Sequence, residues 1–177
     1  MGDPKFAKKQ YKTPRHPWQA VRIKEEQGLL KEYGLKNKKE LWKMQGHLRG
    51  WQEQARKIAG LSGESRDKAQ LILIGKIAKL GILTKGAQID DVLSLTIREV
   101  LERRLQTQLY KQGMAFTPKQ ARQFIVHNKV EVNGVRINAP SYLIKTTDKL
   151  SLVPGFTIKV IEKPKAIEAV VKAEVKE

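Results

Sequence analysis

Apolar residues recur at intervals of three and four along much of this chain, which is the spacing of one buried face of an α-helix. The clearest stretch covers residues 38–58, similar spacing covers residues 64–80 and 97–110, and residues 18–33 are a further helical candidate. A glycine follows within three residues of each stretch, as is common where helices end. We therefore predict four helices, with two clear apolar stripes: Leu41, Met44, Leu48, Trp51, Ala55 and Ile58 in the clearest stretch, and Ile97, Leu101, Leu105 and Leu109 in the last.

A fifth helix is predicted from its start signal. Thr117 is a favourable capping residue, Pro118 suits the first helical position, and Gln120 completes a capping box. The helix is predicted to continue to His127, with Ala121, Phe124 and Ile125 facing inward.

The spacing changes to strict alternation over residues 130–137, which indicates β-strands. Asn133-Gly134 divides them and is the preferred two-residue hairpin turn, because both positions require a positive φ. The turn places Val132 opposite Val135 and Val130 opposite Ile137 on one side, and Glu131 opposite Arg136 on the other. Residues 149–153 and 157–161 are predicted as two further strands that pack back on the helical part.

These elements predict an α+β protein with four segments. They are an extended basic arm (residues 1–17), a helical domain (18–95), a small domain of two helices packed on a short antiparallel sheet (96–161) and a flexible tail (162–177). Trp18, Trp42 and Trp51 all lie in the first third of the chain. We interpret them as core residues of the helical domain in preference to platforms for stacked bases.

The charge of the chain indicates a polyanionic partner. The formal net charge is +17 and the isoelectric point is near 10.1, which is typical of nucleic-acid-binding proteins. Residues 1–60 carry 15 Lys or Arg against 6 Asp or Glu, and residues 101–140 carry 7 against 2. Residues 61–100 are nearly neutral, with 6 against 5. A solvated basic surface and a membrane-surface protein are the weaker alternatives.

Other classes of chemistry find little support. The chain has no Cys and only three His, so we expect neither disulfides nor a metal site, and no cofactor. No secretory signal or membrane-spanning run is visible, so we expect a cytoplasmic protein. The pair Asp90-Asp91 fits an acidic helix start better than it fits acid–base or Mg²⁺ chemistry. No nucleophile–base set and no phosphate loop is present, so a small-molecule substrate is not expected.

A phosphate-binding surface is the chemistry that the residues do support. The start of the helix at Thr117 offers free N–H groups and a positive dipole end, with Lys119, Arg122 and Gln123 predicted nearby. Arg103, Arg104 and Gln108 are predicted to join from the preceding helix, although the solvent side of an amphipathic helix is an equally good interpretation of them. His127 and Tyr142 fit surface or backbone-bonding roles better than RNA contact. A rigid basic face with few aromatic residues suits folded RNA.

The same region resembles a known family. The residues that carry the resemblance are Arg103-Arg104-Leu105-Gln106, Gly113-Met114-Ala115, Thr117 through Ile125, Val130-Glu131-Val132-Asn133-Gly134 and Pro140-Ser141-Tyr142-Leu143. Together they resemble the RNA-binding domain of the small-subunit ribosomal protein four family. The flanking segments 2–5, 16–18 and 90–93 resemble the archaeal form of that protein.

The resemblance implies a fold and a function. It implies an αL-type RNA-binding motif and a primary binder of small-subunit rRNA, which nucleates assembly of the subunit body and supports translational accuracy. Implied partners are small-subunit rRNA, neighbouring ribosomal proteins and mRNA where it enters the subunit. No metal role carries over, because the Cys ligands of many bacterial members are missing. The implied RNA face comprises Arg103, Arg104, Gln108, Thr117, Lys119, Arg122, Gln123, His127 and Lys129, to which Arg136 of the predicted hairpin is added.

Two rival functions remain open at this point. An RNA-modifying enzyme with the same binding module would require a further catalytic domain, and the rest of this chain is a basic helical block. A free RNA chaperone would use the same surface without being a stoichiometric ribosomal component.

Overall fold

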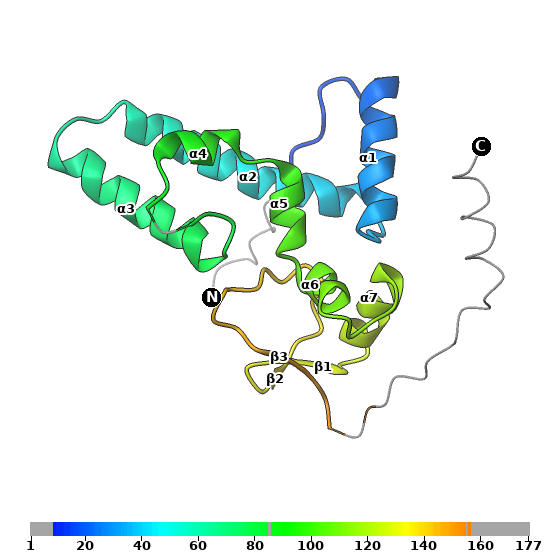
Figure 1. The fold of residues 1–177 in the computed structure, drawn as a ribbon. Coiled ribbons are helices and arrows are strands. Elements are labelled where there is room, and N and C mark those ends of the chain that lie inside the picture. Colours follow the sequence, from blue (N-terminus) through cyan, green and yellow to red (C-terminus); the bar gives the residue numbers. More distant parts are fainter. Residues whose placement is uncertain (1–8, 85, 155, 157–177) are drawn as a thin grey trace, which may run out of the picture.

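The computed structural model describes residues 9–84, 86–154 and 156, and it divides them into two units joined along one side (Figure 1). The helical unit contains the first five helices and the sheet unit contains two helices and three short strands. The elements are α1 (Ala20–Glu32), α2 (Lys38–Ala59), α3 (Glu64–Lys79), α4 (Ile89–Ser94), α5 (Ile97–Glu102), α6 (Leu105–Lys111), α7 (Pro118–Val126), β1 (Val130–Val132), β2 (Val135–Arg136) and β3 (Leu150–Leu152).

The long helix α2 is the centre of the helical unit, and α1, α3, α4 and α5 all pack against it. Every residue of the predicted stripe from Leu41 to Ile58 is buried, as the spacing predicted. Together with Leu73 and Ile77 of α3 and Val100 and Leu101 of α5, this stripe forms the first hydrophobic core. Asp91 of the acidic pair accepts a hydrogen bond from the backbone N–H of Gln88 at the start of α4, so its role as part of an acidic helix start is confirmed.

The three tryptophans do not share one environment. Trp51 is buried and Trp42 is half-buried, whereas Trp18 is 90% exposed, so the prediction of a core position is wrong for Trp18. Trp18 lies in a turn before α1, whereas Trp42 and Trp51 lie on α2, which packs against four other helices.

The single helix predicted over residues 97–110 is wrong, because the chain breaks at Arg103 and Arg104 between α5 and α6. A later segment pairs with the chain there: the N–H of Leu105 donates to the carbonyl of Tyr142 (2.8 Å), and that of Ile144 donates to the carbonyl of Arg103 (3.0 Å). Arg104 has extended backbone angles that a helix does not allow. The apolar stripe still works across the break, since Leu101, Leu105 and Leu109 are fully buried.

The sheet unit packs α6 against α7 and has its own hydrophobic core, which includes Leu109, Ile125 and Val132. The hairpin register is confirmed, with Val132 opposite Val135 and Glu131 opposite Arg136. Val135, however, is 65% exposed, so only the β1 partner of this pair is buried.

The strand predicted near residues 149–153 is β3, and it pairs with β1 to give an antiparallel sheet of order β2-β1-β3. The α+β class is therefore confirmed. The strand predicted over residues 157–161 and the tail predicted over 162–177 lie outside the described residues.

Residues 9–17, from the predicted basic arm, lie along the helical unit without forming a helix or strand of their own. The ring of Tyr11 lies 6.2 Å from that of Trp42 on α2, between their centroids. The segment boundaries proposed from the sequence stay predictions. Within the part of the chain that the structure describes, no helix is long and apolar enough to span a membrane.

Candidate nucleic-acid interface

The start of α7 is built as its sequence predicted. The Thr117 hydroxyl accepts a hydrogen bond from the backbone N–H of Gln120 (3.2 Å), and the Gln120 side chain accepts one from the N–H of Phe116 (2.8 Å). The reciprocal bond thus reaches one residue further back than in a standard capping box. The cap holds the first turn of α7 so that Lys119 is exposed, and Gln123 is exposed one turn later.

The end of α7 and the hairpin add three further exposed basic side chains. His127 and Lys129 follow α7 directly, and both are exposed. The Lys129 ammonium lies 5.8 Å from the centroid of the Phe156 ring, which is within the range of a cation–π contact. Arg136 of β2 reaches Glu131 on β1 at 3.4 Å but stays largely exposed. These side chains can therefore meet an anion from outside.

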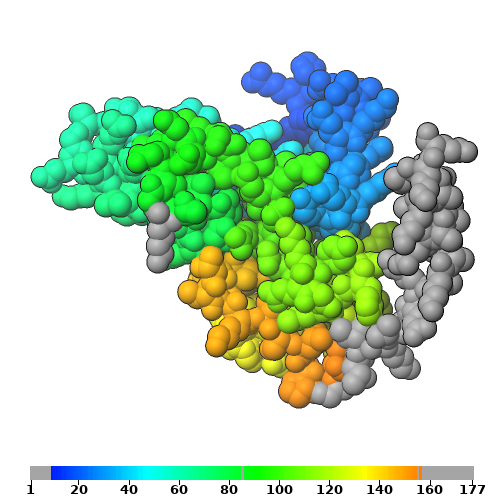
Figure 2. Space-filling view, in the orientation of Figure 1, coloured from blue at the N-terminus to red at the C-terminus, as the bar shows by residue number. Residues whose placement is uncertain are grey.

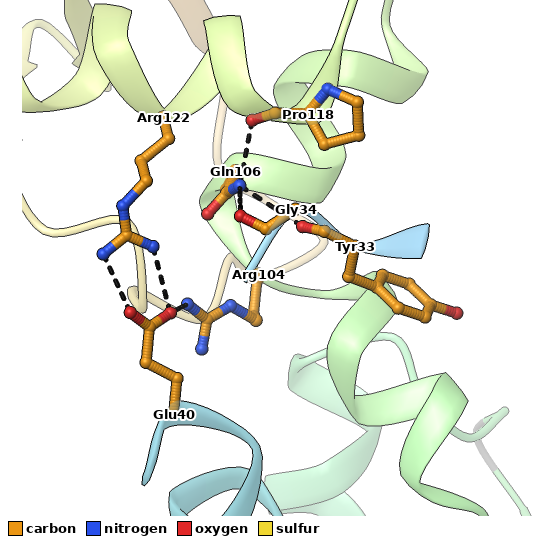
Figure 3. A network of polar contacts seen from close by, with 7 residues as sticks. All are labelled: Tyr33, Gly34, Glu40, Arg104, Gln106, Pro118 and Arg122. Carbon is orange, nitrogen blue, oxygen red and sulfur yellow. Dashed lines mark hydrogen bonds and ion pairs between the residues drawn. The ribbon is translucent and has the colours of Figure 1, made fainter. Parts of the chain in front are cut away.

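Two of the predicted RNA-binding arginines instead bind a carboxylate of the helical unit. Figure 3 shows Arg122 of α7 and Arg104 converging on Glu40 of α2. Arg122 donates to both carboxylate oxygens, at 2.8 and 3.0 Å, and Arg104 donates to one of them at 2.9 Å. The two guanidinium groups share one carboxylate, and these charge-assisted hydrogen bonds connect the two units.

The outward orientation predicted for Arg104 is wrong. Its side chain is only 1% exposed, because the break between α5 and α6 turns it into the space between the units. Burial lowers the pKa of Arg104, and the neighbouring Glu40 opposes this shift. Nε and Nη1 of Arg104 have no hydrogen-bond partner among the described residues. This side chain therefore serves the contact between the units.

Gln106 on α6 is a second buried link that sequence reasoning missed. Its amide donates hydrogen bonds to the backbone carbonyls of Tyr33 (3.2 Å), Gly34 (3.0 Å) and Pro118 (2.9 Å), as Figure 3 shows. Gly34 has a φ of +61°, and a Cβ there would lie 2.7 Å from that of Pro118, so only glycine fits. We call these residues, together with Glu40, Arg104 and Arg122, the joint between the units. A single polar residue beside a stripe of leucines gave no signal of this role.

Arg103 and Gln108 are also engaged inside the protein. The guanidinium of Arg103 donates to the carbonyl of Gly81, and the amide of Gln108 donates to the carbonyl of Glu102 (2.9 Å). Both side chains are half-buried. The predicted site residues therefore fall into an exposed group and a group held within the protein. The exposed group comprises Thr117, Lys119, Gln123, His127, Lys129 and Arg136, and the second group comprises Arg103, Arg104, Gln108 and Arg122.

Three adjoining hollows extend the positive surface from the joint along residues 9–16. The first, of about 430 Å³, contains Lys9, Lys43 and the joint residues Glu40, Arg104 and Arg122. The second, of about 310 Å³, shares Lys9 with the first and is lined also by Lys12 and Arg49. The third, of about 390 Å³, shares these last two residues and adds Arg15, His16 and Arg22. We call the three together the basic groove.

The chemistry that this arrangement allows is binding of phosphate. Exposed ammonium and guanidinium groups form charge-assisted hydrogen bonds with phosphate oxygens, and the rigid helix and hairpin fix their spacing. Within the described residues, no group of three or more His, Asp or Glu side chains is placed to hold a metal ion. The fold and surface thus define a small RNA-binding module attached to a helical unit.

Comparison with known proteins agrees with this class. The S4 domain family model matches residues 103–150, which run from the break before α6 to the first residue of β3. The small ribosomal subunit protein uS4 of Methanococcus aeolicus is 47% identical, over 98% of this chain and 100% of that protein. The uS4 protein of Methanothermobacter thermautotrophicus is 44% identical, again over 98% of this chain and 100% of its own length.

The chain therefore belongs to the uS4 family of small ribosomal subunit proteins, in its archaeal form. As a member of that family it is a structural, rRNA-binding component of the small subunit and not an enzyme. The resemblance inferred from the motifs around Thr117 and Asn133-Gly134 is confirmed.

Proposed function

We propose that this protein is a primary binder of small-subunit rRNA, which nucleates assembly of the subunit body and supports translational accuracy. The observation that carries the proposal is that the basic side chains of the sheet unit fall into two groups, one paired inside the protein and one exposed. The joint uses Arg104 and Arg122 internally, whereas Lys119 and Lys129 on the same unit are exposed and have no ion pair among the described residues. The exposed lysines have no carboxylate partner in the described part of the chain to compete with a ligand, so this surface suits a polyanion.

The proposed RNA face is centred on α7 and the hairpin. Lys119, Lys129 and Arg136 bind phosphates, and Gln123 and His127 bind phosphate, ribose or base edges. Thr117 holds the start of α7 in place. Arg103, Arg104, Gln108 and Arg122 act by fixing the sheet unit on the helical unit, so that the exposed group meets the RNA in one orientation.

Neighbouring ribosomal proteins, and mRNA where it enters the subunit, are further proposed partners. Leu71 and Ile72 on the outer face of α3 are each 73% exposed, and adjacent exposed apolar residues support a protein contact there. The proposal for mRNA is supported only by the family resemblance.

Filter binding to small-subunit rRNA tests the proposed face. A variant carrying Lys119→Ala and Lys129→Ala should bind more weakly, and the slope of log affinity against log salt should decrease by about 1 for each phosphate that the variant no longer neutralises. The matched control carries Lys57→Ala and Lys68→Ala, which removes the same charge from exposed residues already paired with Glu53 and Glu64.

An equal loss of affinity in both double variants would show that only the total charge matters, and the proposed face would then be wrong. Reconstitution of small subunits separates a primary binder from a free chaperone. A primary binder remains in the purified particle at one copy per subunit and is required for later proteins to join.

A further inference from the structure

Trp18 is the most exposed large apolar side chain in the part of the chain that the structure describes, at 90%. Val21, one turn further on in α1, is 64% exposed. An indole ring gains much from leaving water, and tryptophan is highly buried on average in folded proteins. An indole left in solvent next to a second exposed apolar residue is therefore suited to a partner.

The turn that carries Trp18 is held firmly by the helical unit. Nη2 of Arg22 donates to the backbone carbonyls of His16 (2.8 Å) and Pro17 (2.9 Å), and Nη1 donates to Glu26 (2.9 Å). Glu26 is itself buried, so the same guanidinium group is also anchored to the interior of the helical unit. The backbone before Trp18 is thus ordered in advance, which reduces the entropy lost when a ligand stacks on the ring.

The end of the basic groove lies next to Trp18. Its third hollow is lined by His16 and Gln19, the residues two before and one after Trp18 in sequence. The same lining includes Lys12, Arg15, Arg22 and Arg49 and no carboxylate. In Figure 2 the early part of the chain, drawn in dark blue, lies on the far side of the helical unit from the sheet unit. Arg22 is paired with Glu26, but Lys12, Arg15 and Arg49 have no ion pair among the described residues. An exposed aromatic ring beside such cations is the pairing that single-stranded nucleic acid uses, with bases on rings and phosphates on cations.

We propose that Trp18 stacks on an unpaired base of the small-subunit rRNA, and that the phosphates flanking this base lie in the third hollow of the basic groove. The inference rests on the proposed function and adds a second contact, on the helical unit, to the one proposed at Lys119 and Lys129 on the sheet unit. A protein partner is the alternative occupant. The lining has cations and no carboxylate, which favours RNA, because a protein surface would bring a mixture of charges to the hollow.

Tryptophan fluorescence with purified rRNA tests the stacking directly. Wild-type protein has one exposed indole, since Trp51 is buried and Trp42 is half-buried and donates to Glu26. Iodide should quench a component of the emission that is missing in Trp18→Phe. Adding small-subunit rRNA should quench that component and protect what remains of it from iodide.

Binding measurements complete the test. Trp18→Ala should bind rRNA about 5- to 150-fold more weakly, the range for loss of one stacked base, while Trp18→Phe keeps most of the affinity. Leu61→Ala, at an exposed apolar residue between α2 and α3, is the matched control and should bind like wild type.

The results separate this inference from the proposed function. If Trp18→Ala binds rRNA as wild type does while the Lys119/Lys129 double variant does not, the RNA face stands and the stacking is wrong. Protection of Trp18 that requires added ribosomal proteins, and is not produced by rRNA alone, would assign the turn to a protein partner and overturn the inference as well.

Discussion

Glu26 and Glu40 lie on the neighbouring helices α1 and α2, and each binds two cations, but the cations come from different parts of the molecule. Arg22 and Lys38 bind Glu26 at 2.9 and 3.2 Å, and both belong to the helical unit. Arg104 and Arg122 bind Glu40 at 2.9 and 2.8 Å, and both belong to the sheet unit or its border.

The two carboxylates therefore have different roles. Glu26 stabilises one unit from inside, and it also accepts a hydrogen bond from the indole of Trp42 (3.0 Å). Glu40 fixes how one unit lies on the other. In a protein with a net charge of +17, the comparison teaches that a cation near an RNA-binding surface can belong to the protein's own architecture. The cations must be assigned to their partners before a binding face is proposed.

The largest effect is expected from a variant that unfolds the sheet unit and leaves the helical unit folded. Val132→Asp should abolish the folding of the sheet unit, because Val132 is only 3% exposed and an unpaired buried carboxylate costs several kcal/mol, a large part of a typical stability of about 5–15 kcal/mol. Val135→Asp is the matched control, since Val135 lies directly opposite but is exposed. Circular dichroism and amide exchange should show α2 still protected in Val132→Asp. Loss of both units together would mean that they form one cooperative body.

An intermediate effect is expected at the joint. Glu40→Gln leaves the buried Arg104 without a counter-charge and should lower the free energy of unfolding by about 1–3 kcal/mol. Glu53→Gln breaks only an exposed pair with Lys57 and should cost about 0–1 kcal/mol. Denaturant unfolding of both variants gives the comparison. Equal stabilities would indicate that the joint contributes no more than a surface ion pair.

The smallest effect concerns Glu26 and acid. Burial raises the pKa of Glu26, but hydrogen bonds from Trp42 and Lys38 and the charges of Arg22 and Lys38 outweigh it, so the pKa lies below its ordinary value of 4.5. The stabilisation by the ionised form is therefore present above pH 4.5 and is lost as the pH falls through the lowered value. Unfolding measured between pH 6 and pH 3, as an approximate range, should show a shallower loss of stability in Glu26→Gln. An identical pH dependence in the two proteins would contradict this role.

Local signals explain why parts of the sheet unit were predictable. The cap at Thr117 and the turn at Asn133-Gly134 are determined by residues that are close in sequence, so a short stretch of sequence is enough to predict them. Asn133 and Gly134 have φ values of 53° and 80°, as this hairpin turn requires. The exposure of Lys119 followed in the same way from its place in the first turn of α7.

Distant contacts explain what the sequence did not reveal. The break before α6 is made by Tyr142 and Ile144, while the apolar spacing continues across it unchanged. Arg104 and Arg122 bind a carboxylate that lies 64 and 82 residues away. Nothing near either arginine distinguishes it from a solvent-exposed one. For the same reason, Trp18 resembled the other two tryptophans until its surroundings were known.

The hydrogen bonds of the Gln106 amide also affect the order in which a newly made chain folds. It binds carbonyls 72 and 73 residues earlier in the chain, at Gly34 and Tyr33, whereas all partners of Glu26 lie within 16 residues. At about 5–20 residues per second, synthesis takes roughly 4–15 s to cover that separation. During this interval on the ribosome, α1 and α2 can already associate through Glu26, while the turn at Gly34 waits for its partner. A newly made chain can thus pair α1 with α2 before it contains the residue that orients its RNA-binding domain.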